Sequence, residues 1–204
     1  MNKKLFRHLY FVLKLLRPRQ WIKNFALFAA IVFGGQLFEG DVFVEVLFGF
    51  IAFCLLSSST YVINDILDSG KDRLHPFKKA RPIASGVVST PEAIVIFVII
   101  LLSALFIAIN INITFFLVAL FYLALQIAYS FWFKAIEIFD IFFIAAGYII
   151  RVFAGEAITA AWLAPNPGRK LHKEEEKMLA PNILAASFFS NFKSEISCFG
   201  IFTF

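Results

Sequence analysis

The chain has 204 residues, of which 60% are hydrophobic and 28 are phenylalanine, and its mean hydropathy is +0.81. A soluble domain of this size has too little interior to hide so many apolar side chains, so the composition excludes a soluble protein and indicates an integral membrane protein. The net charge of +5 would suggest nucleic acid as a partner of a soluble protein. Here the basic residues gather at the N-terminus and in the loop before Pro91, where membrane orientation and anionic headgroups explain them, and we expect no nucleic acid.

The first twenty residues mix six Lys and Arg with Leu, Phe and Tyr. This pattern predicts an amphipathic interfacial segment that stays on the cytoplasmic side. A first span follows at residues 25–38, introduced by Trp21, Lys23 and Asn24. It is short, because a transmembrane helix needs about 20 apolar residues, unless Trp21 and Ile22 join it and Lys23 faces a cavity or snorkels.

Four more apolar runs predict further spans, at about residues 42–63, 90–109, 113–131 and 138–162. The third span begins with a capping box of Ser89 and Glu92, or with Thr90 as the cap before Pro91. Basic residues alternate between the connecting loops, which places the N-terminus and residues 64–90 in the cytoplasm. The sequence therefore predicts an all-α, multi-pass protein of the inner (cytoplasmic) membrane with about five spans.

The second span leads directly into a polar stretch, NDILDSGKDRLHPFKKARPIASG, at residues 64–86. If this stretch begins as a helix, Asn64, Asp65, Asp68 and Asp72 fall within an arc of about 100°. Neighbouring carboxylates repel one another unless a cation lies between them, and hard oxygen ligands favour magnesium. We therefore predict a magnesium site formed by these four residues.

A basic run follows the acidic face: Lys71, Arg73, His75, Lys78, Lys79 and Arg81. A metal on one side and cationic donors on the other is the arrangement that a diphosphate needs. For the basic residues taken alone, a solvated loop on the cytoplasmic side is the favoured interpretation, since loops between spans are often rich in Lys and Arg.

Arg151 lies near the middle of the fifth span. Facing lipid it would cost at least about 2.5 kcal/mol, so it should face a polar cavity or an acid. A structural ion pair with another helix and a role in binding substrate phosphate are both open at this point.

The segment NDILDSGKD (64–72) resembles the NDxxDxxxD signature of the UbiA superfamily of intramembrane prenyltransferases. The extended pattern is similar to the branch of decaprenyl-phosphate phosphoribosyltransferases. It comprises RPRQWIKN (17–24), RLHPFKKARPIASG (73–86), YSFWFK (129–134) and Arg151.

The resemblance implies a UbiA-like helical bundle around a cavity open to lipid, with magnesium holding a diphosphate. In this branch the diphosphate is that of phosphoribosyl pyrophosphate, and a polyprenyl phosphate accepts the phosphoribosyl group. By position, the residues implied to be catalytic are Asp65, Asp68 and Asp72, which with Asn64 would also hold the metal. Those implied to bind substrate are Lys23, Asn64, Arg73, Lys78, Arg81, Tyr129, Lys134 and Arg151.

Two alternatives remain open. One is transfer of a prenyl group from a polyprenyl diphosphate to an aromatic acceptor, and the other is a non-enzymatic membrane subunit or lipid-binding fragment. The family has nine spans and a second acidic motif, for which the acidic run at residues 174–176 is no substitute. We therefore expect residues 1–162 to form the N-terminal part of the bundle. Residues 163–204 are expected to form an atypical polar tail, left by a truncation or a shifted reading frame.

Overall fold

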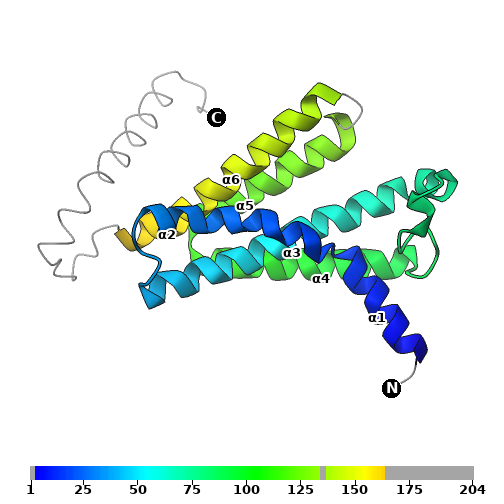
Figure 1. Ribbon diagram of the computed structural model, residues 1–204, viewed down its shortest axis with the longest axis horizontal. Coiled ribbons are helices and arrows are strands. Elements are labelled where there is room, and N and C mark those ends of the chain that lie inside the picture. Colours follow the sequence, from blue (N-terminus) through cyan, green and yellow to red (C-terminus); the bar gives the residue numbers. More distant parts are fainter. Residues whose placement is uncertain (1–2, 134–136, 164–204) are drawn as a thin grey trace, which may run out of the picture. The chain divides into compact units, whose positions relative to one another are not determined.

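The computed structural model describes residues 3–133 and 137–163, and every regular element among them is a helix (Figure 1). The elements are α1 (Lys3–Leu15), the 3-10 helix η1 (Pro18–Phe28), α2 (Ala29–Phe33), α3 (Gly40–Leu74), the 3-10 turn η2 (Lys78–Ala80), α4 (Thr90–Ile111), α5 (Ile113–Ala128), the π-helical turn η3 (Tyr129–Phe133) and α6 (Glu137–Leu163). They lie in one compact unit that ends at Trp162. The predicted all-α class is confirmed, whereas the predicted tail lies outside the described residues.

The longest helix, α3, carries the predicted motif on its last turns. Its 35 residues give a length of about 52 Å, whereas the hydrocarbon core of a bilayer is about 30 Å thick. If the apolar first part of α3 fills the core, the turns from Asn64 onward lie beyond it. The helix continues without a break through Asp72 to Leu74, as the motif's spacing predicts.

The first span does not have the predicted bounds of residues 25–38, and Trp21 and Ile22 join it, as the alternative that we left open requires. The segment begins earlier, at Pro18, and consists of η1 followed by the five-residue helix α2. Because a 3-10 helix rises about 2.0 Å per residue instead of 1.5, these elements are stretched and together reach roughly 30 Å. They run antiparallel to α3, since Arg17 contacts Asp65 at one end and the ring of Phe28 lies 6.0 Å from that of Phe43 at the other.

Four described helices are long and apolar enough to cross a membrane, where we predicted about five spans. They are Gly40–Leu74, Thr90–Ile111, Ile113–Trp132 and Ile141–Ala160. The difference is the stretched first segment, whose polar residues face α3 and α6 instead of interrupting an α-helix.

Side-chain caps fix the turns between these helices. Ser89 and Glu92 form the capping box at the start of α4, so the first of the two predicted caps is the one observed. Asn112 caps α5 by accepting from the backbone N–H of Phe115 at 2.7 Å, and its amide also donates to the carbonyl of Ala157 at 3.1 Å. One side chain therefore joins the beginning of α5 to the end of α6.

The main core lies where α6 packs against η1 and α3. A Cβ atom at Gly155 would overlap the carbonyl oxygen of Leu27, so the two backbones touch there. One at Gly49 would lie 2.5 Å from the side chain of Ile158. Only glycine allows this approach, which brings residues of η1 within reach of the middle of α6.

A second, smaller core lies at the end of the bundle that carries the motif. Leu15 of α1 is fully buried there against Val62, Ile83 and Val88. Next to this core the Nε2 atom of His8 lies 2.6 Å from the carboxylate of Glu92. The loop after α3 is thus folded back onto the bundle, which determines where its basic residues lie.

Candidate functional site: a cationic cavity beside the acidic motif

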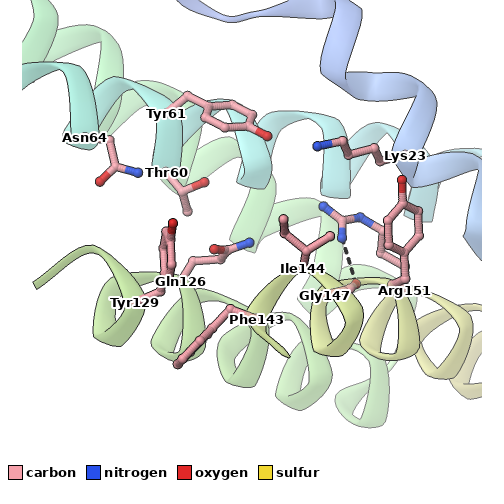
Figure 2. A pocket seen from close by; sticks show the side chains of 11 residues that line it. Lys23, Thr60, Tyr61, Asn64, Gln126, Tyr129, Phe143, Ile144, Gly147 and Arg151 are labelled. Carbon is pink, nitrogen blue, oxygen red and sulfur yellow. Dashed lines mark hydrogen bonds between the residues drawn. The ribbon is translucent and has the colours of Figure 1, made fainter. Parts of the chain in front are cut away.

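A polar cavity of about 170 Å³ lies between α3 on one side and α5, η3 and α6 on the other, with η1 contributing to its wall. Figure 2 shows the ammonium of Lys23 and the guanidinium of Arg151 toward one end, and Asn64 and Tyr129 toward the other. The lining residues are Lys23, Thr60, Tyr61, Asn64, Gln126, Tyr129, Phe143, Ile144, Gly147, Tyr148 and Arg151. Two of them are cations and none is an acid, so this wall attracts anions.

Arg151 is buried, with 4% of its surface exposed. Its Nε donates to Oδ1 of Asn24 at 2.7 Å, Nη1 to the carbonyl of Gly147 at 2.7 Å, and Nη2 to the hydroxyl of Tyr122 at 2.9 Å. The ion pairs found among the described residues do not include Arg151. Of the two environments that we predicted for this arginine, a polar cavity is therefore the one observed.

Aromatic rings complete the surroundings of Arg151. The guanidinium carbon lies 5.0 Å from the ring centre of Tyr122 and 5.8 Å from that of Tyr148. Such contacts stabilise a cation by about 0.5–2 kcal/mol without neutralising it. The charge of Arg151 therefore remains available to an anion in the cavity.

The acidic motif divides into two sides in the structure. Asp65 and Asp72 are buried and share the guanidinium of Arg81, which donates to Asp72 at 2.7 Å and to Asp65 at 3.3 Å. Arg17 donates to Asp65 at 2.5 Å and lies 4.9 Å from the ring centre of Tyr61. Two carboxylates and two arginines thus balance one another's charge.

Arg17 adopts the left-handed backbone conformation, with φ of 51°. This conformation costs a non-glycine residue of the order of 1 kcal/mol, and it persists where the surroundings hold it. The pairing with Asp65 and the stacking on Tyr61 are the contacts that hold Arg17 in place.

Asn64 and Asp68 form the other side of the motif. Asn64 lines the cavity, and Asp68, half-buried, follows one helical turn later and so lies on the same side of α3. Magnesium usually takes one or two carboxylates together with substrate phosphates and waters. The donor chemistry of Asn64 and Asp68 fits such a shared ion. Within the described residues, no three acidic, His or Cys side chains lie close enough to hold a metal by themselves.

The predicted substrate-binding residues fall into three groups. Lys23, Asn64, Tyr129 and Arg151 come together around the cavity, and Tyr129 stacks on Phe143 with ring centres 5.2 Å apart. Arg81 lies beside the acids instead. Of the remaining three, Arg73 is exposed on the last turn of α3, Lys78 is exposed in η2, and Lys134 is outside the described residues.

Sequence reasoning missed several residues of this site. Gln126 lines the cavity and is the one polar side chain between Tyr122 and Tyr129, an isolation in an apolar helix that could have singled it out. Asn24 and Tyr122 hold Arg151 from 127 and 29 residues away, and no local pattern links such distant positions.

The chain is similar to curated proteins over about 70% of its length. It is 38% identical to the decaprenyl-phosphate phosphoribosyltransferase of Mycolicibacterium smegmatis over 148 residues, which cover 71% of this chain and 46% of that protein. The enzyme of the same name from Corynebacterium glutamicum is 34% identical over 154 residues, covering 71% and 45%. The nodulation protein NoeC of Azorhizobium caulinodans is 31% identical over 139 residues, covering 68% and 45%. The chain thus spans about half the length of these relatives.

The fold also resembles a solved structure, that of digeranylgeranylglyceryl phosphate synthase, with a TM-score of 0.63 and 21% identity. The likeness covers 77% of this chain and 57% of the other, and it concerns the fold alone. The UbiA prenyltransferase family matches residues 24–191, which contain the acidic motif and every residue lining the cavity except Lys23. With four apolar helices and this match, the chain is a multi-pass integral membrane protein that belongs to the UbiA prenyltransferase family.

Proposed function

We propose that the chain contributes the phosphate-binding part of a magnesium-dependent transferase that moves a phosphoribosyl group from phosphoribosyl pyrophosphate to a polyprenyl phosphate. The observation that carries this proposal is the cavity wall. Two cations, Lys23 and Arg151, line the cavity, and no carboxylate does. The acidic motif lies on α3, the helix from which Asn64 lines the same cavity. The names of the relatives at 34–38% identity support the phosphoribosyl substrate over a prenyl diphosphate.

The residues around the cavity suggest how the reaction proceeds. A phosphate oxygen of the lipid forms a bond to the anomeric carbon of the ribose, while the bond from that carbon to pyrophosphate breaks. Pyrophosphate leaves with the electron pair, so negative charge grows on the leaving group. Lys23 and Arg151 stabilise that charge or hold the accepting phosphate, and the buried Arg151 acts as a fixed charge whose orientation its three hydrogen bonds hold.

Magnesium fits the motif side of this site. Asn64 and Asp68 would hold it together with phosphate oxygens, and the bound ion would neutralise part of the charge on the diphosphate. Asp65 and Asp72, which we predicted as further ligands, are paired with Arg17 and Arg81. We propose that these pairs position the motif helix and that Arg81 also contacts phosphate.

The remaining predicted residues complete the proposal. Tyr129 lines the cavity, whereas Arg73, Lys78 and Lys134 are proposed as further phosphate contacts. The concentration of basic residues at this end of the bundle supports a cytoplasmic N-terminus in the inner membrane. Phosphoribosyl pyrophosphate, a water-soluble substrate, would then reach the site from the cytoplasm.

Protection from heat tests the substrate class. The purified chain is heated with magnesium and either phosphoribosyl pyrophosphate or geranylgeranyl diphosphate, at equal concentrations. We expect the first ligand to raise the melting temperature and Arg151→Gln to abolish that shift, because a ligand that binds only the folded state stabilises it. Protection by geranylgeranyl diphosphate alone would favour prenyl transfer to an aromatic acceptor instead, and protection by neither would favour a non-enzymatic role.

A further inference from the structure

The contacts of Arg151 are unusual for a charged group at membrane depth. Ionisable side chains in such positions commonly pair with an opposite charge. Arg151 donates three hydrogen bonds to neutral oxygens, those of Asn24, Gly147 and Tyr122. A guanidinium has five N–H donors, so two remain without a bond to the described part of the chain. The side chain of Arg151, which carries these two N–H groups, lines the cavity.

Asn24 is held in one orientation by contacts at both ends of its amide. Its Oδ1 accepts from Nε of Arg151 at 2.7 Å, and its Nδ2 lies 3.3 Å from Sγ of Cys54 and 3.4 Å from Oγ of Ser57. Asn24 is fully buried, so no water competes for these bonds. An aspartate would have nearly the same shape, but it would neutralise Arg151 at hydrogen-bond distance.

Tyr122 restrains the guanidinium from the other side. Its hydroxyl accepts from Nη2 of Arg151 at 2.9 Å and from Nε2 of Gln126 at 3.0 Å, and 1% of its surface is exposed. A phenolic hydroxyl can accept hydrogen bonds without carrying a charge of its own. The hydroxyl therefore orients Arg151 and leaves its charge intact.

We propose that Asn24 and Tyr122 are positioning residues that fix the guanidinium of Arg151 toward the cavity while keeping its charge uncompensated for a bound phosphate group. The inference rests on the proposed function, since it concerns the same cavity. A neutral pair of acceptors preserves the charge, because a buried carboxylate in place of either would satisfy the arginine internally. The phosphate group belongs either to phosphoribosyl pyrophosphate or to the lipid monophosphate, which share the same chemistry.

Asn24→Asp separates charge from shape. The full chain is titrated with phosphoribosyl pyrophosphate and, separately, with farnesyl phosphate, with magnesium present. The melting temperature at each ligand concentration gives the affinity for each source of phosphate. We expect Asn24→Asp to keep or raise the melting temperature without ligand and to weaken binding of one of the two by about tenfold or more. The ligand whose affinity falls is the one that Arg151 contacts. Unchanged affinity for both ligands would overturn the inference.

Two further variants control this experiment. Asn110→Asp introduces the same charge at an exposed position of α4 and is expected to change neither affinity. Tyr122→Phe removes one acceptor and keeps the ring, and we expect it to weaken binding by about threefold to tenfold. If Asn24→Asp does not fold, this second variant decides, and normal binding by Tyr122→Phe would contradict the proposed role.

The transfer reaction distinguishes this inference from the proposed function. Loss of phosphate binding in Asn24→Asp, with no phosphoribosyl transfer by the wild-type protein, would leave the positioning role standing and remove the proposed reaction. If the wild-type protein transfers the phosphoribosyl group and Asn24→Asp does so with the same KM, the proposed reaction stands and the positioning role is removed.

Discussion

The bundle contains two buried charge clusters, one around Asp65 and Asp72 on α3 and one around Arg151 on α6, and they are built in opposite ways. Around Asp65 and Asp72, arginines from two different segments supply the opposite charge at 2.5–3.3 Å. Around Arg151, every described hydrogen-bond partner is neutral. Among the residues that the structure describes, the first cluster is electrically complete and the second is not.

This difference indicates that one cluster stabilises the fold and that the other binds a ligand. A compensated cluster contributes to the folded state, because loss of either partner leaves a buried charge unpaired. An uncompensated buried cation lowers the stability of the folded state, and it gains a favourable electrostatic interaction only when an anion binds. We therefore expect the Asp65 cluster to govern unfolding and the Arg151 cluster to govern ligand binding.

The largest expected effect breaks the compensated cluster. Arg81→Met should lower the free energy of unfolding by about 3 kcal/mol, because Asp65 and Asp72 would remain buried side by side. Arg151→Met should cost about 1 kcal/mol or less, because removal of an uncompensated buried charge offsets most of the loss of its three hydrogen bonds. Denaturation in detergent micelles measures both, with the exposed Lys79→Met as the control. Equal losses for the two arginines would mean that the clusters do not differ in this way.

The second prediction disturbs the backbone contact behind the cavity. Gly155→Ala should cost about 1–3 kcal/mol, because the new methyl group would overlap the carbonyl of Leu27 and force η1 away from α6. Binding of phosphoribosyl pyrophosphate should weaken as well, since Asn24 and Lys23 lie on η1.

Gly70→Ala is the matched control variant, because a Cβ atom at Gly70 on α3 would meet open space. There we expect a gain of roughly 0.5–1 kcal/mol from improved helix propensity. A Gly155→Ala protein as stable as the wild type would contradict the close approach of the two segments.

The third prediction concerns removal of the metal. Phosphoribosyl pyrophosphate at about 100 times its Kd should stabilise the wild-type chain by about 2.7 kcal/mol in magnesium, and a chelator should remove most of this effect. Asp68→Asn should behave like the chelated wild type, whereas Asp41→Asn, exposed in the first turn of α3, should keep the full effect. Heat-protection curves with and without magnesium give the answer. Equal protection after chelation would remove magnesium from the proposal.

The smallest expected effect tests the exposed basic loop. Lys78→Ala and Lys79→Ala should each change stability by less than about 0.5 kcal/mol, because both side chains are exposed. If the role implied by the family for Lys78 applies here, that variant alone should bind phosphoribosyl pyrophosphate more weakly. Identical binding by the two variants would indicate that the loop acts only through its net charge.

Much of the fold follows from local sequence patterns. The long apolar runs and the capping box at Ser89 predict α3 to α6, and the helical period carries α3 through Asp72. The first span was predicted with the wrong start because its polar residues, Lys23 and Asn24, interrupt an apolar run. In the folded protein they face α3 and α6 instead.

The site was predictable only in part, for a physical reason. The helical period places four oxygen-bearing side chains within one arc, but Asn64 and Asp65 differ by only about 100°. Which of them meets the cavity and which meets Arg81 depends on what packs against each side. Arg81 reaches the acids because the chain turns back after Leu74 through η2, which brings the guanidinium of Arg81 to 2.7 Å from Asp72. Such a return is set by tertiary packing and not by the motif.

The position of Arg151 has a consequence for how the protein is made. Among the described helices α6 leaves the ribosome last, and it carries an arginine that an isolated helix inserts at a cost of about 2.5–3.5 kcal/mol. Asn24 and Tyr122 have by then already entered the bilayer on earlier segments. The half-built bundle thus offers polar partners to the arriving helix, and Asn112 and Leu27 mark where it docks. Biogenesis of α6 is therefore expected to depend on the N-terminal segment, so that deletion of residues 17–33 would impair membrane insertion of α6 itself.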